Sequence, residues 1–178
     1  MSFVAQMLAY VSLPFYIQGP LGRTVVATGL IMTPWPVMTA LMAPIAGRLA
    51  DRFPAGILGG IGLVVMATGL CLLARLPVHP STFDIAWRMA ICGVGFGFFQ
   101  TPNNRAILMT APIERTGGAG GMLSTARLLG QTTGAALVAL IFGWAGSPGT
   151  VLPLVIAAAC ALAGAVTSSL RLRRWTAA

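Results

Sequence analysis

The chain has 178 residues, of which 57% are hydrophobic and 8% are charged, and its formal net charge is +8. Soluble domains carry roughly a quarter of their residues as charges, so this composition excludes a soluble domain and predicts an all-α polytopic membrane protein, since a backbone in lipid must satisfy its own hydrogen bonds. The basic residues lie between apolar stretches, where they interact with lipid head groups and help to set the orientation of the chain during insertion. This placement argues against nucleic-acid binding.

Six apolar stretches follow one another along the chain, at residues 3–18, 25–46, 55–76, 85–109, 118–144 and 150–170. A helix needs about 20 residues to cross the hydrocarbon core, so the first stretch predicts an unusually short helix. Nothing after it resembles a signal-peptidase site, so we do not interpret it as a cleaved signal. We predict a single six-helix transmembrane domain over residues 1–178, with a cytoplasmic tail at 171–178.

The arginines alternate between the gaps that separate these stretches. The second gap, the fourth gap and the tail together hold seven of them: Arg48, Arg52, Arg105, Arg115, Arg171, Arg173 and Arg174. The first and third gaps hold only Arg23 and Arg75, and the fifth holds none. Because basic loops stay in the cytoplasm, this pattern predicts a multi-pass protein of the cell (inner) membrane with both termini cytoplasmic.

Titratable and metal-binding side chains are almost absent from the apolar stretches. Asp51, Asp84 and Glu114 are the only carboxylates, and all of them fall in gaps or at boundaries. Proton coupling needs a titratable group within the span, and arginine stays charged. The three cysteines are isolated, without metal or redox spacing. We therefore predict that the chain is not an enzyme and has no catalytic residue, no cofactor and no metal site.

The fifth stretch carries a stripe of small and polar residues. Its members recur every three or four positions, which places them on one side of a helix: Gly120, Ser124, Arg127, Gln131 and Gly134. Helix packing explains the glycines, and an aqueous cavity explains the arginine. Arg127 either has an interior role, with Gln131, Asn103 and Asn104 as neighbours, or extends to the membrane surface.

Other features predict bent helices and one ordinary ion pair. Gly93, Gly95 and Gly97 indicate close backbone packing in the fourth stretch, because no strand precedes them as a nucleotide-binding loop would require. Asp84 and Arg88 have the spacing of a helical ion pair. Prolines within the stretches predict distortions, and the candidates are Pro14, Pro34, Pro36 and Pro102.

The second gap, between the stretches 25–46 and 55–76, contains a motif that resembles one of a known family. Its sequence Gly47-Arg48-Leu49-Ala50-Asp51-Arg52 resembles the loop motif that lies between the second and third helices of each half in the major facilitator superfamily. The segments 13–18, 97–104 and 120–134 are similar to the last six helices of the fourteen-helix drug:proton antiporter branch of that family. The resemblance covers essentially the whole chain.

This resemblance implies a C-terminal half-bundle of a major facilitator fold. The first, second, fourth and fifth helices would face a central cavity, with the third and sixth outside. The cavity-lining or substrate-binding candidates are Gln6, Tyr10, Gln18, Trp35, Gln100, Asn103, Asn104, Arg127 and Gln131. Gly47, Asp51 and Arg52 would form a cytoplasmic gating loop, and the alternative for Asp51 is a helix cap or local ion pair.

Two departures from the family bear on function. The basic residues that usually follow the loop are replaced by Pro54, Ala55 and Gly56, and the N-terminal half that generally holds the coupling acids is missing. The resemblance therefore implies the C-terminal half of a multidrug-efflux-type facilitator for lipophilic or amphipathic small molecules, incomplete alone. Besides the lipid bilayer, its partner would be an N-terminal half or another copy of itself. The alternatives are a half-size transporter that acts as a homo- or hetero-oligomer, and a non-transporting membrane scaffold or truncated gene remnant.

Overall fold

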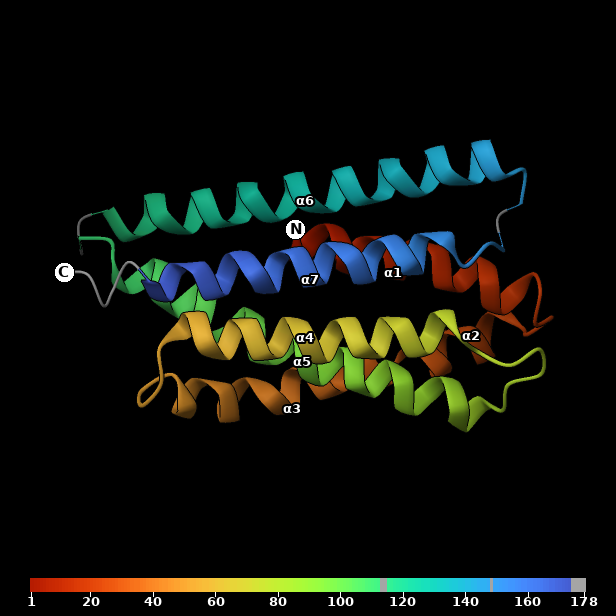
Figure 1. The fold of residues 1–178 in the computed structure, drawn as a ribbon, viewed down its shortest axis with the longest axis horizontal. Coiled ribbons are helices and arrows are strands. Elements are labelled where there is room, and N and C mark those ends of the chain that lie inside the picture. The colour runs from red at the N-terminus through yellow and green to blue at the C-terminus, as the bar shows by residue number, and fades with distance from the viewer. Residues whose placement is uncertain (113–114, 148, 174–178) are drawn as a thin grey trace.

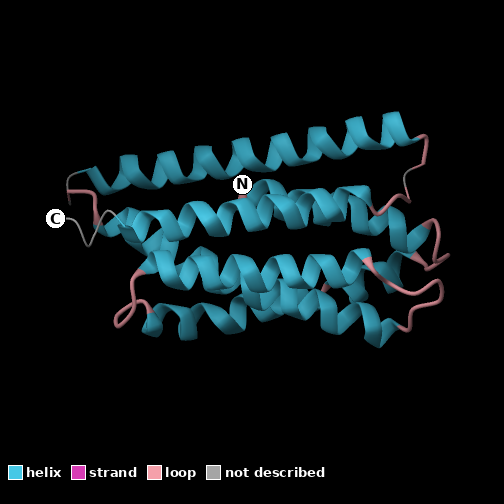
Figure 2. Ribbon diagram, viewed as in Figure 1, coloured by secondary structure: helices cyan, strands magenta, loops and turns pink. Residues whose placement is uncertain are grey.

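The computed structural model describes residues 1–112, 115–147 and 149–173, and these residues form an elongated bundle of helices joined by short loops (Figure 1 and Figure 2). The predicted all-α fold class is confirmed. The helices are α1 Ser2–Gln18, α2 Val25–Met32, α3 Pro34–Leu49, α4 Ala55–Ala74, α5 Thr82–Met109, α6 Thr116–Ala145 and α7 Leu152–Arg173.

The second predicted stretch forms one candidate span, Val25–Leu49, that is built from two consecutive helices. α2 ends at Met32 and α3 begins at Pro34. Pro34 has no backbone N–H to donate, and proline is well tolerated as the first residue of a helix. The hydroxyl of Thr33 donates to the carbonyl of Gly29, 2.9 Å away, which adds a partner at the end of α2. Pro36 then lies in the first turn of α3 without breaking it.

The prolines predicted to distort the first and fourth stretches lie inside continuous helices. Pro14 is within α1 and Pro102 is within α5. α5 also begins earlier than predicted, at Thr82, because the hydroxyl of Ser81 accepts a hydrogen bond from the backbone N–H of Asp84 at 3.0 Å. Such a cap satisfies one of the free N–H groups at a helix start.

α1 is the shortest of the predicted crossings. It has 17 residues, which at the α-helical rise gives about 26 Å. In the described part of the chain, five segments are long and apolar enough to cross a membrane, and α1 is not one of them: Val25–Leu49 (α2 with α3), Ala55–Ala74, Thr82–Met109, Thr116–Ala145 and Leu152–Leu170. Figure 1 places the N-terminus partway along the bundle rather than at either end.

Glycines set the distance between α5 and its two neighbours. In a helix, residues four apart share a face and a residue midway between them points the other way. Accordingly Gly93 and Gly97 face α3, where an added Cβ would lie within about 3.0 Å of Met38 and Met42, and Gly95 faces α4. An added Cβ on Gly95 would lie 2.6 Å from the carbonyl oxygen of Gly62. α5 is therefore packed closely between α3 and α4.

The remaining contacts complete the bundle. α4 packs against α5 and α7, and α1 packs against α6 and α7. α4 is the most buried of the five candidate spans and α6 is the least. α6 lies along one edge of the bundle in Figure 1, and the loops that follow α3 and α5 lie at the end where α7 ends. The opposite end holds the loops that follow α1, α4 and α6.

Candidate functional site

Residues of four helices line an open cavity of about 560 Å³, called the central cavity below. Residues from α1, α3, α5 and α6 line it, and none from α4 or α7 does so: Gln6, Tyr10, Pro36, Thr39, Ala40, Ala43, Phe96, Gln100, Thr101, Asn104 and Arg127. The size is within the range of pockets for small molecules, roughly 300–1,000 Å³. The polar side chains in this lining come from the four helices that the family resemblance predicts to face the cavity.

Arg127 reaches this cavity across the contact between α6 and α1. Gly130, nearly one turn further along α6, leaves room for Phe3, whose Cβ would lie 2.8 Å from a Cβ at that position. The Phe3 ring packs edge-on against Phe96, with 6.0 Å between centroids. The guanidinium carbon of Arg127 lies 5.8 Å from the centroid of the same Phe3 ring, a cation–π distance. The close contact between Gly130 on α6 and Phe3 on α1 therefore places Arg127 next to the Phe3 ring.

Two amide side chains present buried oxygen atoms at the cavity. Oε1 of Gln6 and Oδ1 of Asn104 are both shielded from solvent and have no hydrogen-bond partner among the described residues. An unsatisfied buried polar atom costs roughly 1–3 kcal/mol, so each of these amides gains from a ligand group that donates to it. Gln100 and Thr101, on the same helix as Asn104, also line the cavity.

An aromatic pair supports the wall next to Gln6. The Tyr10 ring lies 5.0 Å from the Trp35 ring, at a tilt of 45°. Trp35 itself is only 1% exposed and does not line the cavity. The hydroxyl of Thr39 donates to the backbone carbonyl of Trp35 at 3.0 Å and to that of Gly93 at 3.1 Å, which connects α3 to α5. Trp35 thus contributes by packing.

The structure separates the remaining candidates from the cavity. Gln18 is exposed at the end of α1, and Gln131 is half-buried on α6 without lining the cavity. Asn103 lines a different cavity, at the end of the bundle that holds the loop after α3. Sequence reasoning did not select Thr39, Phe96 or Thr101, because single threonines and aromatics within apolar stretches carry no distinctive spacing.

The predicted gating loop forms its ion pair with α5. A carboxylate oxygen of Asp51 lies 2.6 Å from a guanidinium nitrogen of Arg105, and the other terminal nitrogen of Arg105 donates to the carbonyl of Gly47 at 3.1 Å. Arg52 is exposed beside the same loop and lines the second cavity, of about 1,010 Å³. Arg105, which the sequence analysis used only as a topological marker, is therefore the residue that ties Gly47 and Asp51 to α5.

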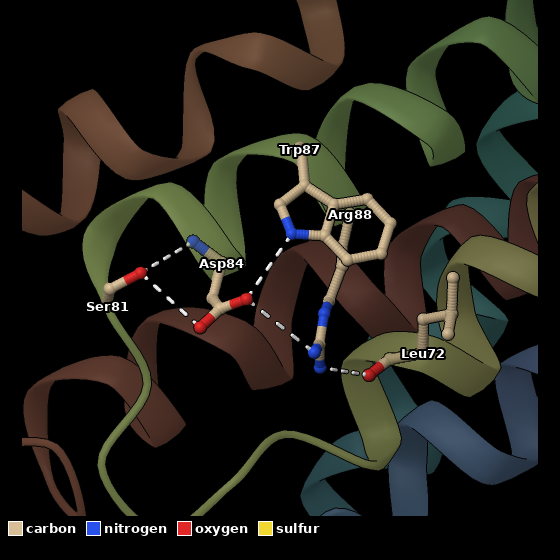
Figure 3. Close-up of polar contacts among 5 residues, drawn as sticks. All are labelled: Leu72, Ser81, Asp84, Trp87 and Arg88. Atoms are coloured by element: carbon tan, nitrogen blue, oxygen red, sulfur yellow. Dashed lines mark hydrogen bonds and ion pairs between the residues drawn. The ribbon is translucent and has the colours of Figure 1, made fainter.

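At the opposite end, Arg88 connects α5 to α4 (Figure 3). Its terminal nitrogens donate to the carbonyl of Leu72 at 2.7 Å and lie 3.8 Å from the carboxylate of Asp84. The indole N–H of Trp87 also donates to Asp84, at 3.4 Å. The expected pair between Asp84 and Arg88 is present, but the shorter contact of Arg88 is the one to α4.

Comparisons with known proteins agree with this architecture. A family model described as the Major Facilitator Superfamily matches residues 1–174. The chain is 56% identical over 171 residues to the Escherichia coli protein named uncharacterized transporter YebQ, covering 96% of this chain and 37% of the relative.

Two more distant relatives carry functional names. The chain is 31% identical over 140 residues to the riboflavin transporter RibZ of Clostridioides difficile, covering 79% of this chain and 31% of the relative. It is 30% identical over 130 residues to the multidrug resistance protein Stp of Mycobacterium tuberculosis, covering 72% and 24%. The chain thus spans little more than a third of the length of these relatives, or less. It belongs to the major facilitator superfamily and is an integral multi-pass membrane protein.

Proposed function

We propose that this chain is the C-terminal half of a multidrug-efflux-type facilitator, and that its central cavity forms one side of the substrate path. The observation that carries the proposal is the polar cavity built by α1, α3, α5 and α6. Its wall combines amides, an arginine and aromatic rings, which suits small lipophilic or amphipathic molecules. In transporters of this kind, one half rocks against the other around a central site.

The proposed partner is an N-terminal half, or a second copy of this chain. Asp51, Asp84 and His79 lie in loops or near helix ends, outside the cavity wall, and Glu114 lies outside the described residues. We propose that the complete transporter takes its proton-coupling acids from the other half. The proposed location is the inner membrane, with both termini in the cytoplasm. The Asp51–Arg105 contact would hold the cytoplasmic gating loop against α5 in one of the two access states.

The test is an efflux assay on a fused transporter. The chain is joined to the part of the Escherichia coli relative that it does not match, and expressed in cells that lack their main efflux pumps. We expect the fusion to lower the accumulation of Nile red, a neutral lipophilic dye, in a proton-dependent manner. Ala40→Trp, which fills the cavity, should abolish this effect, and Ala159→Trp on the exposed surface of α7 should not.

Three results would contradict the proposal. Proton-dependent efflux from vesicles that contain only this chain would show that it needs no N-terminal half. Equal activity of the Ala40→Trp and Ala159→Trp fusions would show that the central cavity is not on the substrate path. A fusion that reaches the membrane and folds but moves no dye would contradict the transport function itself.

A further inference from the structure

The electrostatics of the central cavity are those of a site for negative charge. Arg127 lines it, and no Asp or Glu among the described residues does so. The described ion pairs join Arg88 to Asp84 and Arg105 to Asp51, and neither includes Arg127. A guanidinium keeps its charge at any physiological pH. Arg127 is an exposed residue of α6 within a candidate membrane span. A cation at membrane depth is costly without a counter-charge, so an anionic ligand offsets that cost.

The shape of the Arg127 guanidinium indicates which anionic groups of a ligand it can bind. Its fixed fork of N–H donors matches the two oxygens of a carboxylate, or those of a sulfonate or phosphate. The Phe3 ring lies 5.8 Å from the guanidinium carbon of Arg127, and a cation that is stacked on an aromatic face loses less side-chain freedom when it binds. Arg127 is therefore already oriented before the anion arrives.

The rest of the wall selects for a planar ring with hydrogen-bond donors. Tyr10 supplies aromatic surface, which favours stacked or edge-on contact with another ring, and the buried Phe96 packs behind it. The buried oxygens of Gln6 and Asn104 lack partners among the described residues, and each accepts a hydrogen bond from an N–H or O–H group of a ligand. The volume of about 560 Å³ accommodates a molecule of drug size.

We propose that the cavity selects aromatic anions, with Arg127 binding the acidic group of the substrate and Gln6 and Asn104 binding donor groups on its ring. This inference rests on the proposed function, because it assigns a substrate class to the same cavity. It goes further by predicting that this half of the cavity binds lipophilic cations more weakly than anions, since they would face an arginine with no carboxylate of the described residues beside it.

The experiment compares two dyes that share a xanthene ring and differ in charge. The full chain is placed in lipid nanodiscs, and binding of fluorescein, which is anionic, and of tetramethylrhodamine methyl ester, which is cationic, is measured by fluorescence anisotropy against empty nanodiscs. The variants are Arg127→Gln, Arg127→Lys and the matched control Arg75→Gln. Arg75 is exposed at the end of α4, away from the cavity.

We expect fluorescein to bind the unchanged chain at least about tenfold more tightly than the cationic dye, because the guanidinium of Arg127 attracts the anion and repels the cation. Arg127→Gln should remove this preference, Arg127→Lys should restore part of it, and Arg75→Gln should leave it intact. Tighter binding of the cationic dye, or a preference for fluorescein that survives Arg127→Gln, overturns the inference while leaving the proposed function standing. Failure of both dyes to bind, together with inactivity of the fused transporter, overturns both proposals.

Discussion

At the scale of single residues, the polar groups near the two ends of the bundle connect helices rather than form a reactive site. Arg88 is 13% exposed and donates to the carbonyl of Leu72 at the end of α4 (Figure 3). Its guanidinium carbon also lies 5.2 Å from the centroid of the Trp87 ring. The ion pair with Asp84 is longer and its carboxylate is 39% exposed. The hydrogen bond to the α4 backbone should therefore contribute more to stability than the ion pair.

A pair of substitutions tests this ranking. Arg88→Met should lower the free energy of unfolding by about 1.5–3 kcal/mol, because it removes a charge-assisted hydrogen bond to a helix end. Asp84→Asn should lower it by less than about 1 kcal/mol, as expected of a partly exposed ion pair. Unfolding in mixed detergent micelles, followed by circular dichroism, measures both changes. An equal loss in the two variants would assign the stability to the ion pair instead.

At the scale of helices, close packing depends on the positions of glycines, which have no side chain. Gly95 on α5 and Gly62 on α4 approach each other so closely that a Cβ on either would lie 2.6 Å from the carbonyl oxygen of the other. Both neighbours are backbone atoms, which cannot rotate away as a side chain can. In lipid, such contacts between small residues are a main source of helix association. By contrast, Gly121 on α6 has nothing within 4 Å of an added Cβ.

Adding a single methyl group at these positions should have opposite consequences. Gly95→Ala should lower the free energy of unfolding by about 1–3 kcal/mol or more, because α4 and α5 must move apart. Gly121→Ala should leave it unchanged or raise it by up to about 1 kcal/mol, because alanine favours the helix. The same detergent unfolding measurement compares the two variants. A stable Gly95→Ala protein would mean that the α4–α5 contact yields more readily than its backbone distances indicate.

At the scale of the whole molecule, the loops alternate between the two ends of the bundle. The loops after α3 and α5 lie at one end, where α7 also ends, and those after α1, α4 and α6 lie at the other (Figure 1). The loops after α3 and α5, which lie at one end, correspond to the arginine-rich gaps of the sequence, and the loops at the other end correspond to the arginine-poor gaps. The orientation that we predict from the arginines places the end with the loop after α3 in the cytoplasm.

Cysteine accessibility tests this orientation. In a variant without Cys71, Cys92 and Cys160, single cysteines are introduced as Val78→Cys, in the loop after α4, and Phe53→Cys, in the loop after α3. Both side chains are exposed. A maleimide that does not cross membranes should label Val78→Cys in intact spheroplasts and Phe53→Cys only after lysis. The reverse labelling would mean that the arginine count misassigns the cytoplasmic side.

Much of the candidate site was accessible from the sequence. Polar residues within apolar stretches are costly in lipid, and on this basis Gln6, Tyr10, Gln100, Asn104 and Arg127 were selected before the structure placed them around one cavity. The remaining placements depend on neighbours in space that no local pattern encodes. Trp35 packs behind the wall, Asn103 lines another cavity, and Asp51 pairs with Arg105 from a distant helix.

The sequence by itself determined that the chain is a helical membrane protein, roughly where its helices lie and which residues are out of place in lipid. These properties depend on local composition, because the bilayer imposes the same demand on every segment. The tertiary structure decided the break at Pro34, the two faces of α5 that its glycines bring against α3 and α4, and the position of Arg127 against Phe3 at the cavity. These features depend on which helices meet, and at what distance, and that is set by contacts between residues far apart in the chain.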